Sequence, residues 1–149
     1  MTKKTKRLLL SVFILALIGA IIVYFIWNKP FTDTEHKKPA YTITAVELFT
    51  TFSTDSATAK TRFIGDENNG KVIQVQGEAA EVKTNQANEQ VILLKTNTSG
   101  AYINCTMGER ALIKAGDNVS IKGMCSGYLF DADMGIPGDV TMVRCYVVK

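Results

Sequence analysis

The residues of this chain best suited to chemistry are its three cysteines, Cys105, Cys125 and Cys145. No two of them have the close C-x-x-C spacing of a zinc site, and the single histidine, His36, is distant in the sequence, which disfavours a metal site. In an oxidising compartment, one disulfide and one remaining thiol account for all three. Three buried free thiols are the alternative, since cysteine packs like a small apolar residue.

Catalytic residues are not indicated by any motif. His36 lies in a polar stretch outside the predicted domain, and no serine, cysteine or carboxylate falls in a recognisable nucleophile or zinc motif. Asp131, Asp133 and Asp139 carry oxygens of the kind that bind calcium, but a solvated acidic loop is the simpler interpretation. We therefore expect a protein that is not an enzyme and needs no metal or cofactor.

An apolar run of 20 residues without a charge, Leu8 to Trp27, follows four basic residues, Lys3, Lys4, Lys6 and Arg7. At ~1.5 Å per residue, a helix of this length spans the ~30 Å hydrocarbon core of a bilayer. Basic flanks favour the cytoplasmic side, so the sequence predicts a single-pass protein of a bacterial inner membrane whose N-terminus is cytoplasmic. A signal peptide cleaved after Ala20 is the alternative, although its apolar region would be unusually long.

This interpretation divides the chain into a basic tail (1–7), a transmembrane helix (8–27), a linker (28–40) and one small domain (41–149), which is expected outside the cytoplasm. The domain has ten basic and twelve acidic residues, a net charge of −2, whereas the whole chain has +3. The positive charge therefore belongs to the N-terminal end, and the domain itself does not have the basic character of a nucleic-acid-binding protein.

Periodicity within the domain predicts one helix followed by strands. Apolar residues keep helical spacing over 44–61, and Thr44 with Glu47 forms a capping-box pattern. The first strand is long and changes phase near Gly77, which indicates a bend. Alternation predicts strands over 71–83, 90–96, 101–107, 118–125 and 139–148, with a turn at Asn69-Gly70, a helical turn over 108–115 and a loop over 126–138. The predicted fold class is mainly β: a five-stranded OB-fold barrel preceded by one amphipathic helix, with an N-terminal transmembrane helix.

Four segments in this order resemble the tRNA_anti-like OB-fold family: TITAVELFTTF, KVIQVQGEA, LIKAGDNVSIKGMCSGYL and DVTMVRCYVV. Each segment is generic alone, and the specificity comes from their order over most of 41–149. The resemblance implies a barrel related in fold to anticodon-binding barrels, and it supplies no catalytic residue. The sequence departs from the pattern between Asp131 and Asp139, where extra residues lengthen the last loop.

The cysteine pairing can be narrowed by this arrangement. Alternation places Cys105, Cys125 and Cys145 on the inward face of the third, fourth and fifth strands. Cys125 and Cys145 would be offset by more than the ~7 Å that a disulfide allows between Cα atoms. In an OB barrel the third strand runs beside the fifth, so Cys105 with Cys145 is the expected pair.

The expected ligand surface combines the outward face of the third strand with the loop after the fourth. Its residues are Tyr102, Asn104, Thr106, Tyr128, Phe130 and Asp131. OB barrels bind oligonucleotides and oligosaccharides with this part of the fold. The alternative is that Tyr128 only plugs the barrel end and that the polar strand residues are merely solvated.

Two functions compete on these observations. The first is a membrane-anchored extracytoplasmic binding module, held through Leu8 to Trp27, for a protein, glycan or small ligand. The alternative is nucleic-acid binding, for which the second and third strands offer one exposed aromatic residue, Tyr102, and one lysine, Lys95. Because the domain is slightly acidic and is expected outside the cytoplasm, the sequence favours the first function and disfavours nucleic acid as a partner.

Overall fold

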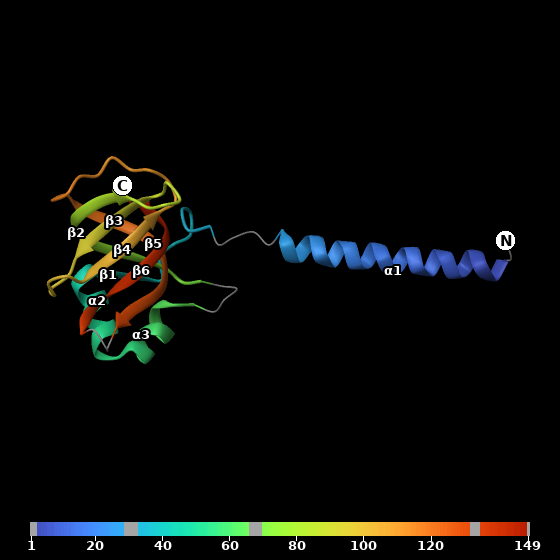
Figure 1. The fold of residues 1–149 in the computed structure, drawn as a ribbon, viewed down its shortest axis with the longest axis horizontal. Coiled ribbons are helices and arrows are strands. Elements are labelled where there is room, and N and C mark those ends of the chain that lie inside the picture. The colour runs from blue at the N-terminus through green and yellow to red at the C-terminus, as the bar shows by residue number, and fades with distance from the viewer. Residues whose placement is uncertain (1–2, 29–32, 66–69, 132–134, 149) are drawn as a thin grey trace. The chain divides into compact units, whose positions relative to one another are not determined.

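The computed structural model of the 149-residue chain describes residues 3–28, 33–65, 70–131 and 135–148, and for residues 3–11, 131, 136 and 137 it describes the backbone alone (Figure 1). The chain divides into two compact units, Met1–Phe31 and Thr32–Lys149. The first unit contains the helix α1 (Lys3–Trp27), whose described apolar side chains are exposed. In the described part of the chain, no helix combines the length and apolar character needed to cross a membrane. The transmembrane assignment of 8–27 therefore stays a prediction from the sequence.

The second unit is a closed, mainly β barrel, as predicted. Its single sheet has the strand order β1-β2-β3-β4-β6-β5, and β2 also pairs with β5, which closes the five strands β2 to β6 into a barrel. The elements are β1 (Tyr41–Thr44), α2 (Ala45–Thr54), α3 (Ser56–Phe63), β2 (Val72–Thr84), β3 (Gln90–Lys95), β4 (Tyr102–Met107), β5 (Asn118–Asp131) and β6 (Ile136–Val147). The parallel pair β4–β6 is the pairing expected between the third and fifth strands of an OB barrel.

The long, bent first barrel strand is confirmed. The first half of β2 pairs with β5 and its second half with β3, and the register shifts between Ala79 and Glu81. This irregularity lies just beyond the bend predicted near Gly77. Gly77 has a packing role, because a Cβ at this position would lie 3.0 Å from the Cβ of Ala45 in α2.

The single predicted helix over 44–61 is wrong in one respect, since the structure has two helices. Asp55 has an extended backbone (φ −144°, ψ 86°) and ends α2, and its carboxylate accepts the N–H of Thr58 to begin α3. A short aspartate side chain competes with the helical backbone in this way, so the apolar spacing continues while the helix axis changes. The strand β1 is also additional: it pairs in parallel with β2, a contact between distant segments that local periodicity does not report.

The predicted loop over 126–138 is replaced by a β-hairpin. Strand β5 continues to Asp131 and β6 begins at Ile136, with register shifts that absorb the irregular sequence. Gly138 permits the close approach, because a Cβ there would lie 1.9 Å from the carbonyl oxygen of Leu129. The glycine at this position of the 126–138 segment therefore indicates close contact between two strands and not a loop. The helical turn predicted over 108–115 is absent, and Asn69 of the predicted Asn69-Gly70 turn lies outside the described residues.

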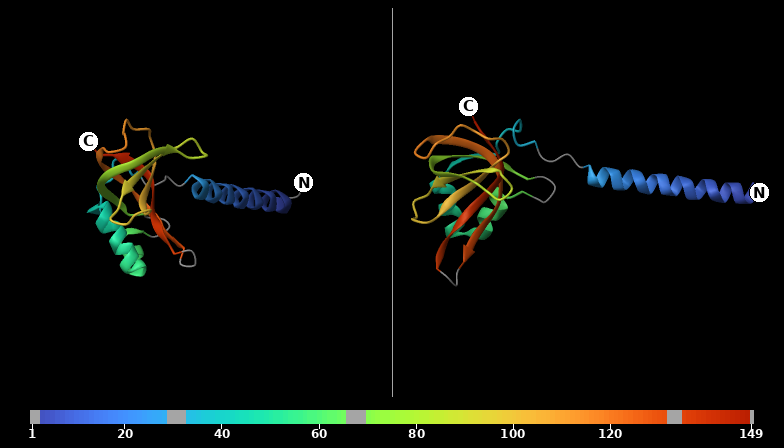
Figure 2. Two further views of the ribbon diagram at one scale, coloured as in Figure 1. Left: turned by 60° about the vertical axis from the view of Figure 1, so that its left-hand side comes forward. Right: turned by 45° about the horizontal axis from the view of Figure 1, so that its top comes forward.

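The core lies inside the barrel and continues into the two short helices at one end of it (Figure 2). The apolar stripe predicted for the helix is buried: Leu48, Phe49 and Phe52 of α2 and Phe63 of α3 are all inaccessible or nearly so. Helix α2 contacts β2, β3, β4 and β6, so it covers this end of the barrel. Burial of the apolar stripe, more than helix propensity, holds an element of only 10 residues.

The capping box of α2 generates a first prediction. The Thr44 Oγ1 accepts the N–H of Glu47 at 3.2 Å, and the Glu47 carboxylate accepts the N–H of Thr44 at 3.1 Å. The Thr44 backbone N–H, with its hydroxyl, holds the pKa of Glu47 below the ordinary range. Thr44→Ala should therefore lower the free energy of unfolding by about 1 kcal/mol, measured by chemical denaturation. Thr50→Ala, on the exposed side of the same helix, is the control, and an equal loss in both variants would contradict a capping role.

Candidate functional site

The outer face of β4 is the first part of the predicted site. Tyr102, Asn104 and Thr106 are partly exposed and alternate with Ile103, Cys105 and Met107, which are buried in the barrel. The three partly exposed residues therefore share one face of the barrel, as the sequence predicted.

The neighbouring strand β3 extends this face. Lys95, Leu93 and Val91 stand in register with Tyr102, Asn104 and Thr106, respectively. Leu93 and Val91 are buried, so of these three residues of β3 only Lys95 adds an exposed side chain to the face.

Asp139 of β6 positions the polar face, and the sequence did not single it out for this role. One of its carboxylate oxygens accepts the backbone N–H of Tyr102 and the other accepts the side-chain amide of Asn104, both at 2.8 Å. The bonds orient Asn104 and hold the first residue of β4 against β6. The sequence interpretation considered Asp139 only as a possible calcium ligand. Its contact with β4 leaves no local signal in the sequence, because the pairing of β4 with β6 brings together residues 35 or more positions apart.

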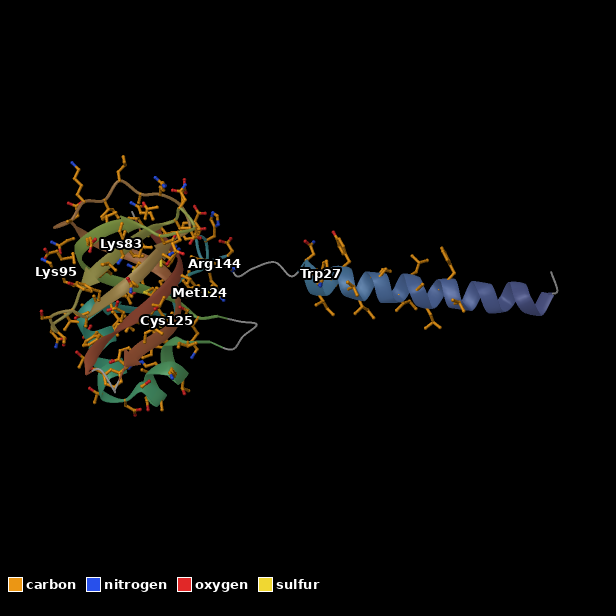
Figure 3. All side chains as sticks on the ribbon, in the orientation of Figure 1. Trp27, Lys83, Lys95, Met124, Cys125 and Arg144 are labelled. Atoms are coloured by element: carbon orange, nitrogen blue, oxygen red, sulfur yellow. The ribbon has the colours of Figure 1, made fainter. Side chains whose placement is uncertain are left out.

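Two lysines flank the face. Lys83 and Lys95 are exposed, and they come from β2 and β3 on the outside of the barrel (Figure 3). Lys95 forms an ion pair with Glu78, whereas Lys83 stands in register with the buried Val91. Lys83 stands beside Val91, and Lys95 comes four residues after Val91 on β3. The two lysines are therefore separated by roughly 13 Å along the strand direction. The lysines at the margin therefore stand with acidic groups, since Glu78 pairs with Lys95 and the Asp139 carboxylate lies on the face itself.

Tyr128 and Phe130 do not join the β4 face, which corrects the predicted grouping. Leu129 pairs with Asp139, whose carboxylate lies on the outer face, so the side chains of Tyr128 and Phe130 point the other way. The Tyr128 ring packs against Phe49 and Phe52 of α2 at the barrel end. Its role as a plug, the alternative considered above, is therefore what the geometry supports.

Phe130 lies outside that plug and differs from Tyr128 in exposure. Its ring stacks on the Tyr128 ring with an interplanar angle of 7°, and the residue is 56% exposed. Asp131 is the last residue of β5, and its side chain lies outside the described part of the structure. Of the six predicted ligand-binding residues, the structure thus brings three together on β4 and places two on a separate side of the hairpin.

The three cysteines all point into the barrel and are buried free thiols in the structure. Burial raises the pKa of the Cys125 thiol to about 12, and burial together with the neighbouring Cys105 thiol raises the pKa of Cys145. Such thiols are poor nucleophiles at neutral pH. The inward orientation is confirmed, while the Cys105–Cys145 disulfide is not formed here and stays a prediction for the oxidised protein.

A surface pocket of 720 Å³ lies at the opposite end of the barrel from α2, between an apolar floor that includes Met107 and Ile113 and a rim with Arg110 and Lys122. The rim also contains Glu35 and Glu109, so its charges are balanced. Among the described residues, no group of three His, Cys, Asp or Glu side chains is placed to hold a metal ion.

A closed five-stranded barrel with a polar face on its second and third strands defines an OB-fold binding domain. The chain belongs to the tRNA_anti-like family, whose model matches residues 1–136 and so includes the N-terminal helix. No curated protein matches the chain.

Two solved structures resemble the chain distantly. One is Entamoeba histolytica asparaginyl-tRNA synthetase in complex with asparaginyl-adenylate, with 13% identity and a TM-score of 0.35 over 54% of this chain and 21% of the synthetase. The other, from Leishmania major Friedlin, is assigned as an aspartyl-tRNA synthetase, with 5% identity and a TM-score of 0.39 over 87% of this chain and 25% of that one. The chain thus spans a quarter or less of the length of either.

Membership of the tRNA_anti-like family corrects one expectation. The sequence analysis disfavoured nucleic acid as a partner because the domain has a net charge of −2. That conclusion is wrong, because the family match places the chain among barrels named for their likeness to tRNA anticodon-binding folds. The physical fault lies in the argument from net charge, since a ligand meets the charges of one face and not the sum over the domain.

The buried thiols generate a second prediction. In the native protein at pH 8, all three cysteines should react with iodoacetamide at least about a hundredfold more slowly than an exposed thiol. Ser126→Cys supplies the matched control, because Ser126 is exposed and adjacent to Cys125. Rapid native labelling of Cys105, Cys125 or Cys145 in the mass spectrum would contradict their burial. One reactive thiol per unfolded, unreduced molecule instead of three would establish the disulfide.

Proposed function

We propose that the barrel is a non-catalytic module that binds single-stranded RNA across the outer face of β3 and β4. The observation that carries the proposal is membership of the tRNA_anti-like family, combined with a polar face on the second and third strands of the barrel. These are the strands with which OB folds bind oligonucleotides. The non-catalytic part of the proposal is supported by the raised pKa values of Cys125 and Cys145, which leave these buried thiols protonated.

The residues of this face suit a single strand more than a duplex. Tyr102 supplies an aromatic ring for stacking, and Asn104 and Thr106 supply groups that hydrogen-bond to base edges or to ribose hydroxyls. A base that is not paired presents both its flat face and its edge, so it can use all of these contacts at once.

The charge distribution sets an expectation for the strength of binding. Lys83 and Lys95 can neutralise about two phosphates, and each contributes a slope of about −0.7 to the dependence of log K on log salt for single strands. Lys95 must exchange Glu78 for phosphate, which weakens its contribution. We therefore expect an affinity that depends only modestly on salt, unlike that of a strongly basic binder.

The proposal predicts that Tyr102 supports binding through its ring. In fluorescence anisotropy with the full-length protein and a labelled single-stranded RNA, Tyr102→Ala should weaken binding about 5- to 150-fold, the effect of one stacked base. Tyr102→Phe keeps the ring and is the matched control, so it should bind nearly as the wild type does. Equal affinity of the alanine variant and the wild type would exclude this face.

The same experiment separates the competing ligand classes. A duplex RNA of the same sequence should bind more weakly, because its bases are not available for stacking. If the wild-type protein binds no RNA, the RNA proposal fails, and a protein, glycan or small ligand on this face takes its place. Lys83→Ala should lower the salt slope by about 0.7, which identifies this lysine as a phosphate contact.

The location of the protein is a separate proposal, supported by the sequence alone. We propose that residues 8–27 anchor the chain in a bacterial inner membrane, with the N-terminus in the cytoplasm and the barrel outside. The uncharged run and the four basic residues before it support this arrangement. A barrel outside the cytoplasm would meet only nucleic acid that is present there, so the orientation bears directly on the RNA proposal.

This location predicts that the full-length protein stays in the membrane fraction after alkaline carbonate extraction. Replacing Leu15 and Ile18 with arginine should release it, because charged side chains are costly at the centre of a bilayer. Protease added to intact spheroplasts should digest the barrel. Protection of the barrel until the membrane is opened would reverse the orientation, and release of the wild-type protein by carbonate would exclude the anchor.

A further inference from the structure

A row of aromatic rings connects the buried core to the surface of the β5–β6 hairpin. Phe63 and Phe52 are buried, the Tyr128 ring lies 5.7 Å from that of Phe52, and the Phe130 ring lies 6.1 Å from that of Tyr128. Exposure thus increases along the row, from 0% at Phe63 to 56% at Phe130. The last ring packs on a neighbour and is still largely accessible to solvent.

From this row we propose that Phe130 is a base-stacking platform that binds one nucleobase of a single-stranded nucleic acid, outside the polar face of β3 and β4. This inference rests on the proposed function. A ring that already lies parallel to Tyr128 is held in a fixed plane, and the cost of ordering it is met in the folded protein before any ligand arrives. A nucleobase is a flat ligand that can continue the row, and stacking of this kind tolerates any base.

The support beneath the platform comes from α2 and from the hairpin itself. Tyr128 is held by edge-to-face contact with Phe49 and by its contact with Phe52, both of which are buried. Gly138 of β6 lets the two strands of the hairpin approach closely beside Leu129 and Phe130. Helix packing and a glycine therefore fix the plane of an exposed ring, which a flexible loop would leave free to rotate.

The location of Phe130 explains why it would contact a base and not a phosphate. The residues that precede it on β5, Tyr128 and Leu129, carry no positive charge, so they offer a phosphate no counter-charge beside Phe130. Stacking, in contrast, needs no counter-charge, so the contribution of Phe130 to affinity should be independent of salt.

A strand bound on the outer face must pass around the hairpin to reach Phe130. Leu129 stands in register with Asp139, which is bonded to Tyr102 on the outer face, so the next side chain of β5, Phe130, points to the opposite side. Short oligonucleotides would therefore fill the outer face without touching Phe130. Longer ones would reach both aromatic residues.

The test uses the full-length protein and labelled oligoadenylates of about 4 and about 12 nucleotides, within the site sizes of OB folds. Phe130→Ala should weaken binding of the longer probe about 5- to 150-fold and leave the shorter probe unchanged. The loss should be the same at low and high salt, in contrast to the effect of Lys83→Ala. Phe130→Tyr keeps the ring and should bind as the wild type does.

Leu112→Ala is the control, because Leu112 is apolar, is exposed and lies between β4 and β5, outside both the hairpin and the outer face of β3 and β4. It should not change the affinity. Thermal denaturation of each variant distinguishes loss of stacking from loss of fold. Phe130→Trp gives an independent readout: the longer probe should quench its fluorescence by more than it quenches the fluorescence of the wild type, which comes from Trp27.

The outcomes separate the two proposals. Equal binding of the longer probe by Phe130→Ala and the wild type, or an equal loss in Leu112→Ala, would overturn the platform and leave RNA binding on β3 and β4 intact. Unquenched Phe130→Trp fluorescence in a protein that binds the probe would do the same. Failure of the wild-type protein to bind either probe would overturn both proposals.

Discussion

The whole barrel depends on one strand that pairs with two partners. Strand β2 pairs with β5 along its first half and with β3 along its second half, and the irregularity between Ala79 and Glu81 lies where the partner changes. A bulge of this kind increases the local twist and bends the strand, which is what closure of a small sheet requires. Without this change of partner, β2 would not pair with β5, and the sheet would remain open.

The polar face depends on another pairing in the closed barrel. Strand β6 runs parallel to β4, and this pairing brings the Asp139 carboxylate to the N–H of Tyr102 and to the side-chain amide of Asn104, both of which it accepts. Hydrogen bonds to a charged acceptor are stronger than neutral ones, so this contact fixes the first residues of β4 at the sheet seam. The same closure encloses the three thiols, whose burial makes them part of the core and not a reactive centre.

The two ends of the barrel differ in what covers them. Helix α2 covers one end with buried aromatic rings. These rings contact Tyr128, which in turn stacks on the exposed ring of Phe130, so one row of rings connects the core to the surface. The other end has no helix between β4 and β5, and a charged-rimmed pocket remains there. The net charge of the domain does not describe this face, where Lys83 is exposed, Lys95 pairs with Glu78, and Asp139 is hydrogen-bonded to β4.

The sequence by itself determined the elements whose signals are local: the capping box at Thr44, the alternation that buries Cys105, and the length of β2. It also grouped Tyr102, Asn104 and Thr106 correctly, because alternation along one strand defines a face. Only the tertiary structure decided that β1 pairs with β2, that 126–138 forms a hairpin, and that Tyr128 and Phe130 leave the β4 face. These features depend on contacts between residues far apart in the chain and on backbone approaches that glycine permits, and neither leaves a periodic pattern in the sequence.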